Sequence, residues 1–337
     1  MLPRWLALSA VCGASEPSVV LFGDSVGIPR MLRLLPAGSV RAAVMASIRP
    51  AQREALGSVC AAAGVPLLAQ PRRDDAEHGP FVRSLERLEP DLILVDSYSM
   101  LLAPEVLAVA RRDALNVHGA LLPAYRGANP TQWALLNDER ETGVTIHVMS
   151  AEFDAGDVVA ERRVPIRFDD TWVDIHGRIA EATEALLAEQ LPGILAGAYE
   201  RHPQDPALAR HFRRRTPDDG WIDWNAGVLA IYNLVRALVA PNPGAMYRDG
   251  EETVVLDRYL TISEVAALKY GRAGRRSLGG LVPLADGGNE RVALAVEGGG
   301  CVAVEDIDWD RRRARLTDDV AAARSFAEEQ LGLSLAS

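Results

Sequence analysis

Residues 116–130, NVHGALLPAYRGANP, place an amide and an imidazole two residues apart, just before a loop with two prolines and two glycines. An imidazole takes and gives protons near neutral pH, so His118 is a candidate general base. The amide of Asn116 donates hydrogen bonds and is suited to hold a developing oxyanion. A lone histidine at the end of a strand more often has a structural role, so a catalytic interpretation needs a third group.

Asp154, in the segment AEFDAGD at 151–157, is the best candidate for that third group. Its carboxylate would orient the imidazole and stabilise its charged form. An amide, an imidazole and a carboxylate without a neighbouring serine or cysteine suit acyl transfer by direct attack of a substrate nucleophile. Aspartate is also a common turn residue, and that structural alternative applies to Asp154 and Asp157. We expect His147, in the middle of a predicted strand, to be a packed histidine.

An alternation of strands and helices must position these groups. Because residues two apart in a strand share a face, a strand at 114–119 points Asn116 and His118 the same way. Further strands are expected at 18–24, 40–46 and 91–98, helices at 27–35, 80–90 and 104–113, and a helix followed by a strand start within 50–68. This order predicts an α/β fold with a Rossmann-like, open, mostly parallel sheet, whose sites lie beyond the carboxyl ends of the strands. The first turn, GDSVGIP, lacks GxGxxG, so dinucleotide binding is not predicted.

The sequence pattern in the second half of the chain differs from the strand–helix alternation of the first half. Strands are expected at 142–150 and 158–166 and helices at 173–197 and 228–239, with a domain boundary near 203–210. Short alternating strands after residue 245 predict a small barrel-like all-β unit, and 317–332 predicts an amphipathic helix. The expected limits are an N-terminal extension at 1–17, a catalytic domain at 18–205, a C-terminal β domain at 206–320 and a helix or tail at 321–337.

Composition narrows the function classes. A formal net charge of −10 over 337 residues argues against a large nucleic-acid-binding face. Cys12, Cys60 and Cys301 form neither a metal-binding pattern nor an even disulfide set, so no metal and a cytoplasmic location are expected. The first 15 residues faintly resemble a signal peptide, but their apolar stretch is short. No apolar run of 18 residues exists, so no membrane contact is expected.

The stretch 116–159 resembles the folate-dependent formyltransferase family, which includes methionyl-tRNA, amino-sugar and glycinamide ribonucleotide formyltransferases. The family pattern is Asn-x-His-x-Ser-Leu-Leu-Pro-x-Tyr-Arg-Gly, followed by an Asp within Asp-x-Gly, 36 residues beyond the His. Asn116, His118 and Asp154 fit that spacing, whereas Ala120 stands where the family usually has Ser. Residues 215–247 and the strands up to about 315 resemble the family's C-terminal domain, a small open, OB-like β-barrel.

The resemblance implies a formyl donor, N10-formyltetrahydrofolate, and a primary amine as acceptor. It implies that His118 is the base, that Asn116 and protonated His118 hold the oxyanion, and that Asp154 stabilises the imidazolium. The pterin would lie between 95–102 and 151–157, with Ser97, Tyr98, Met100, Leu101, Ala151, Glu152 and Asp157 as the folate-binding residues. The substrate loop would comprise Leu122, Pro123, Tyr125, Arg126 and Gly127.

The acceptor is less sharply defined. Transfer-RNA formyltransferases carry a basic insertion, but the corresponding segment 46–54 is short and has two arginines, which disfavours tRNA. The arginines at 213–215 are a solvated charge run or a phosphate patch. We favour a nucleotide-linked amino sugar or a specialised-metabolite amine, with methionyl-tRNA and a hydroxyornithine-type siderophore precursor as alternatives. Hydrolysis of the formyl-folate and a non-enzymatic binding module are further alternatives, and a homodimer is expected by analogy alone.

Overall fold

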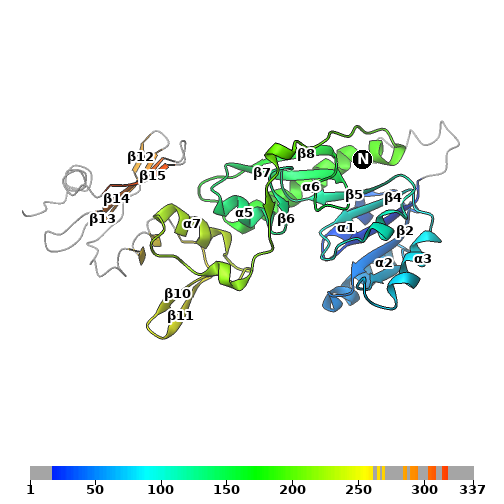
Figure 1. Ribbon diagram of the computed structural model, residues 1–337, viewed down its shortest axis with the longest axis horizontal. Coiled ribbons are helices and arrows are strands. Elements are labelled where there is room, and N and C mark those ends of the chain that lie inside the picture. Colours follow the sequence, from blue (N-terminus) through cyan, green and yellow to red (C-terminus); the bar gives the residue numbers. More distant parts are fainter. Residues whose placement is uncertain are drawn as a thin grey trace, which may run out of the picture. The chain divides into compact units, whose positions relative to one another are not determined.

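The computed structural model describes residues 17–260, 264–265, 268–269, 284–286, 289–294, 303–308 and 313–317. A seven-stranded sheet with the order β3-β2-β1-β4-β5-β7-β8 forms its first part (Figure 1). The strands are β1 (Val19–Gly23), β2 (Val40–Ala46), β3 (Leu67–Gln70), β4 (Leu92–Asp96), β5 (Asp113–His118), β7 (Glu141–Val148) and β8 (Val158–Pro165). Strands β1 to β5 pair in parallel and β7 runs antiparallel to β5, so the mostly parallel sheet is confirmed.

The helices are α1 (Gly27–Leu34), α2 (Arg53–Ala62), α3 (His78–Glu86), α4 (Pro104–Leu107), α5 (Pro130–Leu136), α6 (Trp172–Ala196) and α7 (Val228–Ala237), with 3-10 turns at Pro50–Gln52, Pro206–Leu208 and Pro217–Gly220. The helix predicted at 104–113 is too long. The amides of Arg111 and Arg112 donate to the carbonyls of Pro90 and Asp91, which draws the chain directly into β5. Sequence reasoning also missed α5 and two short paired strands, β6 (Arg126–Gly127) and β9 (His211–Phe212).

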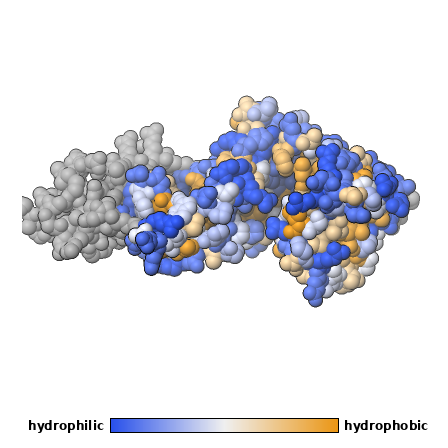
Figure 2. Space-filling view, turned by 60° about the horizontal axis from the view of Figure 1, so that its bottom comes forward, coloured by the Kyte–Doolittle hydropathy of each residue, from blue (hydrophilic) through white to orange (hydrophobic). Residues whose placement is uncertain are grey.

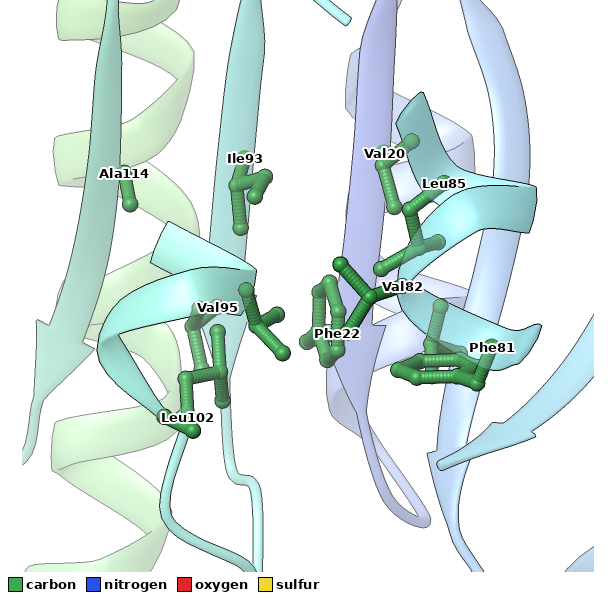
Figure 3. Close-up of a cluster of buried hydrophobic side chains, with 12 residues drawn as sticks. Val20, Phe22, Phe81, Val82, Leu85, Ile93, Val95, Leu102 and Ala114 are labelled. Atoms are coloured by element: carbon green, nitrogen blue, oxygen red, sulfur yellow. The ribbon is translucent and has the colours of Figure 1, made fainter. Parts of the chain in front are cut away.

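The core of the sheet lies around β1 and β4, whose residues are all buried. Such uniformly apolar strands are typical of a parallel sheet covered on both faces. In Figure 3, Phe81, Val82 and Leu85 lie on the face of α3 that meets the sheet, as helical spacing requires. They pack with the sheet residues Val20, Phe22, Ile93, Val95 and Ala114 and with Leu102. This packing gives the strand ends, where the candidate site begins, a rigid base.

The later part of the chain forms antiparallel strands, as predicted. Strand β10 (Ala245–Asp249) pairs with β11 (Glu252–Leu256), and β12 (Leu284–Asp286), β13 (Asn289–Leu294), β14 (Ala303–Asp308) and β15 (Arg313–Thr317) form a four-stranded sheet. Closure into a barrel stays a prediction. The expected extension up to residue 16, and the expected helix and tail beyond 317, lie outside the described residues.

Two compact units emerge, each discontinuous in sequence. The first holds the described residues up to 130, 142–164 and 178–213, and the second holds 131–141, 165–177 and the residues from 214 onward. In the second unit, Arg236 is fully buried, and its Nη1 donates to the carbonyls of Arg167, Phe168 and Asp170. That contact explains why 165–177 joins the unit of α7. The domain limits expected from the sequence stay a prediction.

The surface is mixed in character. On the face drawn in Figure 2, hydrophobic residues are interspersed among hydrophilic ones. Within the part of the chain that the structure describes, no helix is both long and apolar enough to cross a membrane.

Candidate active site

Strand β5 carries Asn116 and His118 to its carboxyl end, with His118 7% exposed. The neighbouring strand β7 fixes the turn that follows. Thr145, opposite His118 in the register, donates its hydroxyl to the Ala120 carbonyl at 2.7 Å and accepts the Leu122 amide at 3.2 Å. Ala120, which stands in place of the expected serine, is fully buried and takes part through its backbone.

The hydrogen bonds of His118 define its tautomer. Its Nε2 lies 2.7 Å from the carbonyl oxygen of Tyr125, which can only accept, so Nε2 carries the hydrogen. In the neutral ring, Nδ1 is therefore the basic nitrogen, and it lies 3.6 Å from Oδ2 of Asp154.

Burial is the main influence on the pKa of His118. Burial lowers this pKa and the nearby His147 acts in the same direction, while the Asp154 charge and the Tyr125 carbonyl raise it, and the net shift is downward. A lowered pKa keeps the imidazole neutral at pH 7 and ready to accept a proton.

Asp154 is held in the loop between β7 and β8 with a positive φ of 51°. Its Oδ2 accepts the Gly127 amide at 2.8 Å, and its Oδ1 lies 3.4 Å from Nε2 of His147. Burial acts to raise the pKa of this carboxyl, but His147, His118 and the Gly127 amide outweigh burial and bring the pKa to about 2. A negative charge therefore faces the basic nitrogen of His118, where it would stabilise a protonated imidazole ring.

His147 is buried, as expected of a packed histidine, but sequence reasoning missed its contacts. Its Nδ1 donates to the Val148 carbonyl at 3.0 Å, and its Nε2 lies 3.1 Å from Nδ2 of Asn116 and 3.4 Å from Oδ1 of Asp154. His147 therefore holds the Asn116 amide beside Asp154, and this amide has an N–H that could bind a substrate oxygen. Asn116 and His147 meet because β7 pairs with β5 in this register, which no local sequence pattern specifies.

The loop after His118 is bound tightly to β9. Gly127 has a φ of 100°, and a Cβ there would lie 2.2 Å from the Phe212 carbonyl oxygen, so only glycine fits. The ring of Tyr125 stacks on that of Phe212 with 4.8 Å between centroids. Of the predicted substrate-loop residues, Leu122, Tyr125 and Arg126 are buried, whereas Pro123 and Gly127 are half-buried. The loop is therefore held in one conformation by its contacts with β9 and Asp154.

The residues predicted to bind folate lie on two loops. In the loop after β4, Ser97 and Leu101 are exposed and Tyr98 and Met100 are half-buried, and in the loop after β7, Ala151 and Glu152 are exposed and Asp157 is half-buried. Asp24 accepts the amides of Ala46 and Ser99, so one carboxylate joins the ends of β1, β2 and β4. Nearby, the hydroxyl of Tyr98 donates to Gln70 at 2.8 Å. These bonds hold the loop after β4 in a defined conformation.

Among the described residues, no cluster of His, Cys, Asp and Glu side chains forms a metal site. The arrangement offers a neutral base, a fixed anion beside it and an amide donor, which together suit transfer of an acyl group to a nucleophile from the substrate.

Comparison with known proteins agrees with this chemistry. A model of the formyl transferase family matches residues 44–191, and a model of the formyl transferase C-terminal domain matches residues 214–314. The same fold is found in a 4-N formyltransferase from Francisella tularensis, with a TM-score of 0.61, 15% identity and coverage of 73% of this chain and 98% of that one.

Two further structures share the fold. A sugar N-formyltransferase from Shewanella has a TM-score of 0.59 at 18% identity and covers 73% of this chain and 98% of its own. An N-formyltransferase from Helicobacter canadensis has a TM-score of 0.58 at 16% identity and covers 82% of this chain and 95% of its own. With both family models matched in chain order, this protein belongs to the formyl transferase family.

Proposed function

We propose that this chain transfers a formyl group from N10-formyltetrahydrofolate to a primary amine on a small molecule, preferably a nucleotide-linked amino sugar. One observation carries the proposal: the basic Nδ1 of His118 faces the ionised Asp154, while the Asn116 amide lies on the same strand face. A protein that only bound a ligand would not need this base, anion and oxyanion donor together.

The residues divide the chemistry between them. The folate supplies the formyl group, and the nitrogen of the neutral amine forms a bond to the formyl carbon. His118 accepts at Nδ1 the proton that the amine loses, and Asp154 stabilises the resulting imidazolium. An N–H of Asn116 and the protonated Nδ1 hold the negative charge on the formyl oxygen. As the bond from carbon to N10 breaks, His118 returns the proton to that nitrogen, so the residues end as they began.

The donor site would use the loops after β4 and β7. Leu101 is 55% exposed and Phe153 is 61% exposed, so one large apolar side chain on each loop is available to cover an aromatic pterin. Backbone groups of Ser97 and Met100 and of Ala151, Glu152 and Asp157 would bind its polar edge, with the side chain of Tyr98 at the base of the pocket.

The acceptor class rests on two supports. The 46–54 segment has two arginines in a chain of net charge −10, which is a poor match to the phosphates of a tRNA. The protein from Helicobacter canadensis with the same fold holds folinic acid and dTDP-3-aminofucose in its complex. A cleft for a sugar nucleotide of that kind is what we expect beside His118.

Measuring the consumption of N10-formyltetrahydrofolate by absorbance, with a panel of amines, tests the proposal. The panel contains several nucleotide-linked amino sugars, hydroxyornithine and charged initiator tRNA. Turnover that needs a nucleotide-linked amino sugar supports the proposal. Turnover with tRNA or hydroxyornithine alone would contradict the acceptor class, and formate release without any amine would mean that the chain is a hydrolase.

A further inference from the structure

We propose that Gln204 is a positioning residue that sets the distance between His118 and Asp154. The kinetic part of this inference rests on the proposed function, whereas its structural part does not. Gln204 lies in the segment between α6 and the 3-10 turn Pro206–Leu208 and is half-buried. It belongs to the same compact unit as the site.

All the hydrogen-bonding groups of the Gln204 amide are engaged. Its Nε2 donates to the carbonyls of Asp154 at 2.8 Å and Gly156 at 2.6 Å. Its Oε1 accepts Nε of Arg126 at 3.0 Å and Nη2 at 2.7 Å. Because a guanidinium only donates and a carbonyl only accepts, these partners also fix which end of the amide is oxygen.

These hydrogen bonds connect the two groups that contact the His118 imidazole, so the contacts around it form a closed network. On one side, Nε2 of His118 donates to the carbonyl of Tyr125, which is followed directly by Arg126. On the other side, Nδ1 of His118 faces Asp154. Gln204 joins the two sides, because its oxygen binds the Arg126 side chain and its nitrogen binds the Asp154 backbone.

The loop at 154–156 needs such support. Asp154 has a left-handed backbone conformation with a φ of 51°, which residues with a Cβ adopt uncommonly. The Gln204 amide holds this conformation in place, because it donates to the carbonyls of Asp154 and Gly156, which flank residue 155. Arg126 needs support as well, since it is 7% exposed and a buried charge must find acceptors. One glutamine meets both requirements.

The consequence is a specific electrostatic effect. Asp154 raises the pKa of His118 against the effect of burial. If the loop relaxes after Gln204 is replaced, the carboxylate moves away from Nδ1 and the pKa of His118 falls further. A replacement should therefore lower the rate of the chemical step more than it changes substrate binding.

Gln204→Met and Gln204→Glu distinguish the bonds of Gln204 to Arg126 from its bonds to the 154–156 loop. Methionine removes all four hydrogen bonds, while glutamate keeps an acceptor for Arg126 and loses both donors to the loop. We expect kcat to fall about 10–100-fold in both variants, with KM for donor and amine within about threefold. Asp205→Ala is the matched control, since Asp205 is exposed and bonds the Ala207 amide within its own turn.

Full activity in Gln204→Glu would overturn the proposal, because the contact with Arg126 alone would then suffice. A second readout does not depend on turnover. The His118 ring signal, assigned by its loss in His118→Ala, is titrated by NMR in each folded variant. The proposal predicts a lower His118 pKa in Gln204→Met and no change in Asp205→Ala, whereas Gln204→Glu serves the kinetic readout alone because its added negative charge itself raises the His118 pKa.

An unchanged His118 pKa in Gln204→Met would refute the positioning role, even if its activity fell. If Gln204→Met does not fold, Gln204→Ala, which also removes all four hydrogen bonds and adds no charge, takes its place in both readouts. If the wild-type chain transfers no formyl group, the proposed function fails, while the titration still decides the role of Gln204.

Discussion

Replacing Asp154 by Asn tests the electrostatic part of the mechanism. The change removes the negative charge, yet an amide oxygen can still accept the Gly127 amide that the carboxylate accepts at 2.8 Å. The fold of the loop should therefore survive. The change removes the charge that would stabilise His118 after it has taken a proton.

The separation of the two groups gives the size of the effect. Oδ2 of Asp154 lies 3.6 Å from Nδ1 of His118. At an effective dielectric constant of about 20, two unit charges at this distance attract by about 4–5 kcal/mol. Since each 1.4 kcal/mol corresponds to roughly a tenfold change in rate, we expect kcat to fall about 10³-fold.

The assay is a pH series of formyl transfer at saturating donor and amine. Burial holds the pKa of His118 below its ordinary value of 6.5, so the acid limb of the wild-type rate should lie below pH 6.5. Asp154 raises that pKa, so Asp154→Asn should move the acid limb to lower pH. Glu161→Gln, an exposed change of the same charge on β8, is the control and should leave the rate and the limb unchanged.

Stability provides a second check with a defined sign. The pKa of Asp154 is about 2 in the folded protein against 3.8 ordinarily, so its ionised form stabilises the fold above about pH 4. That contribution, about 2 kcal/mol, is lost as the pH falls from 4 to 2, and Asp154→Asn should lack this part of the acid sensitivity. For the mechanism itself, an Asp154→Asn variant whose kcat lies within threefold of the wild-type value would refute the electrostatic argument.

Three further predictions concern the oxyanion donor, the loop and the core. Asn116→Ala should lower kcat about 10²–10³-fold in a protein that still folds, and a kcat above one tenth of the wild-type value would exclude Asn116 as the main oxyanion donor. Gly127→Ala should lower the free energy of unfolding in urea by about 2–4 kcal/mol, because a Cβ meets the Phe212 carbonyl at 2.2 Å, and unchanged unfolding would contradict this packing. Arg30→Met should lower the free energy of unfolding in urea by about 3–5 kcal/mol, because the buried Asp96 loses the guanidinium that lies 2.6 Å away. A loss below about 1 kcal/mol would mean that water reaches the Asp96 carboxylate.

Local sequence patterns were sufficient for some of the site. The short apolar runs of β1 and β4 predict buried parallel strands, and two-residue spacing on β5 predicts that Asn116 and His118 share a face. The turn directly after the strand predicted at 142–150 also pointed to Asp154, which lies 3.6 Å from His118. These inferences need only periodicity and turn chemistry.

The missed features depend on contacts between distant segments. His147 meets Asn116 because β7 pairs antiparallel with β5 in one register, and nothing local specifies that register. Arg126 belonged to the predicted substrate loop, yet it is buried against Gln204, 78 residues further along the chain. Sequence periodicity carries no signal for such a side-chain network.

The most direct test of the central claim follows the formyl carbon itself. The wild-type chain is incubated with N10-formyltetrahydrofolate labelled with ¹³C in the formyl group and with a nucleotide-linked amino sugar, and the products are identified by NMR. The account predicts one labelled formamide on the sugar for each donor consumed, and no labelled formamide with His118→Ala. Labelled formate in place of formamide, or undiminished transfer by His118→Ala, would contradict it.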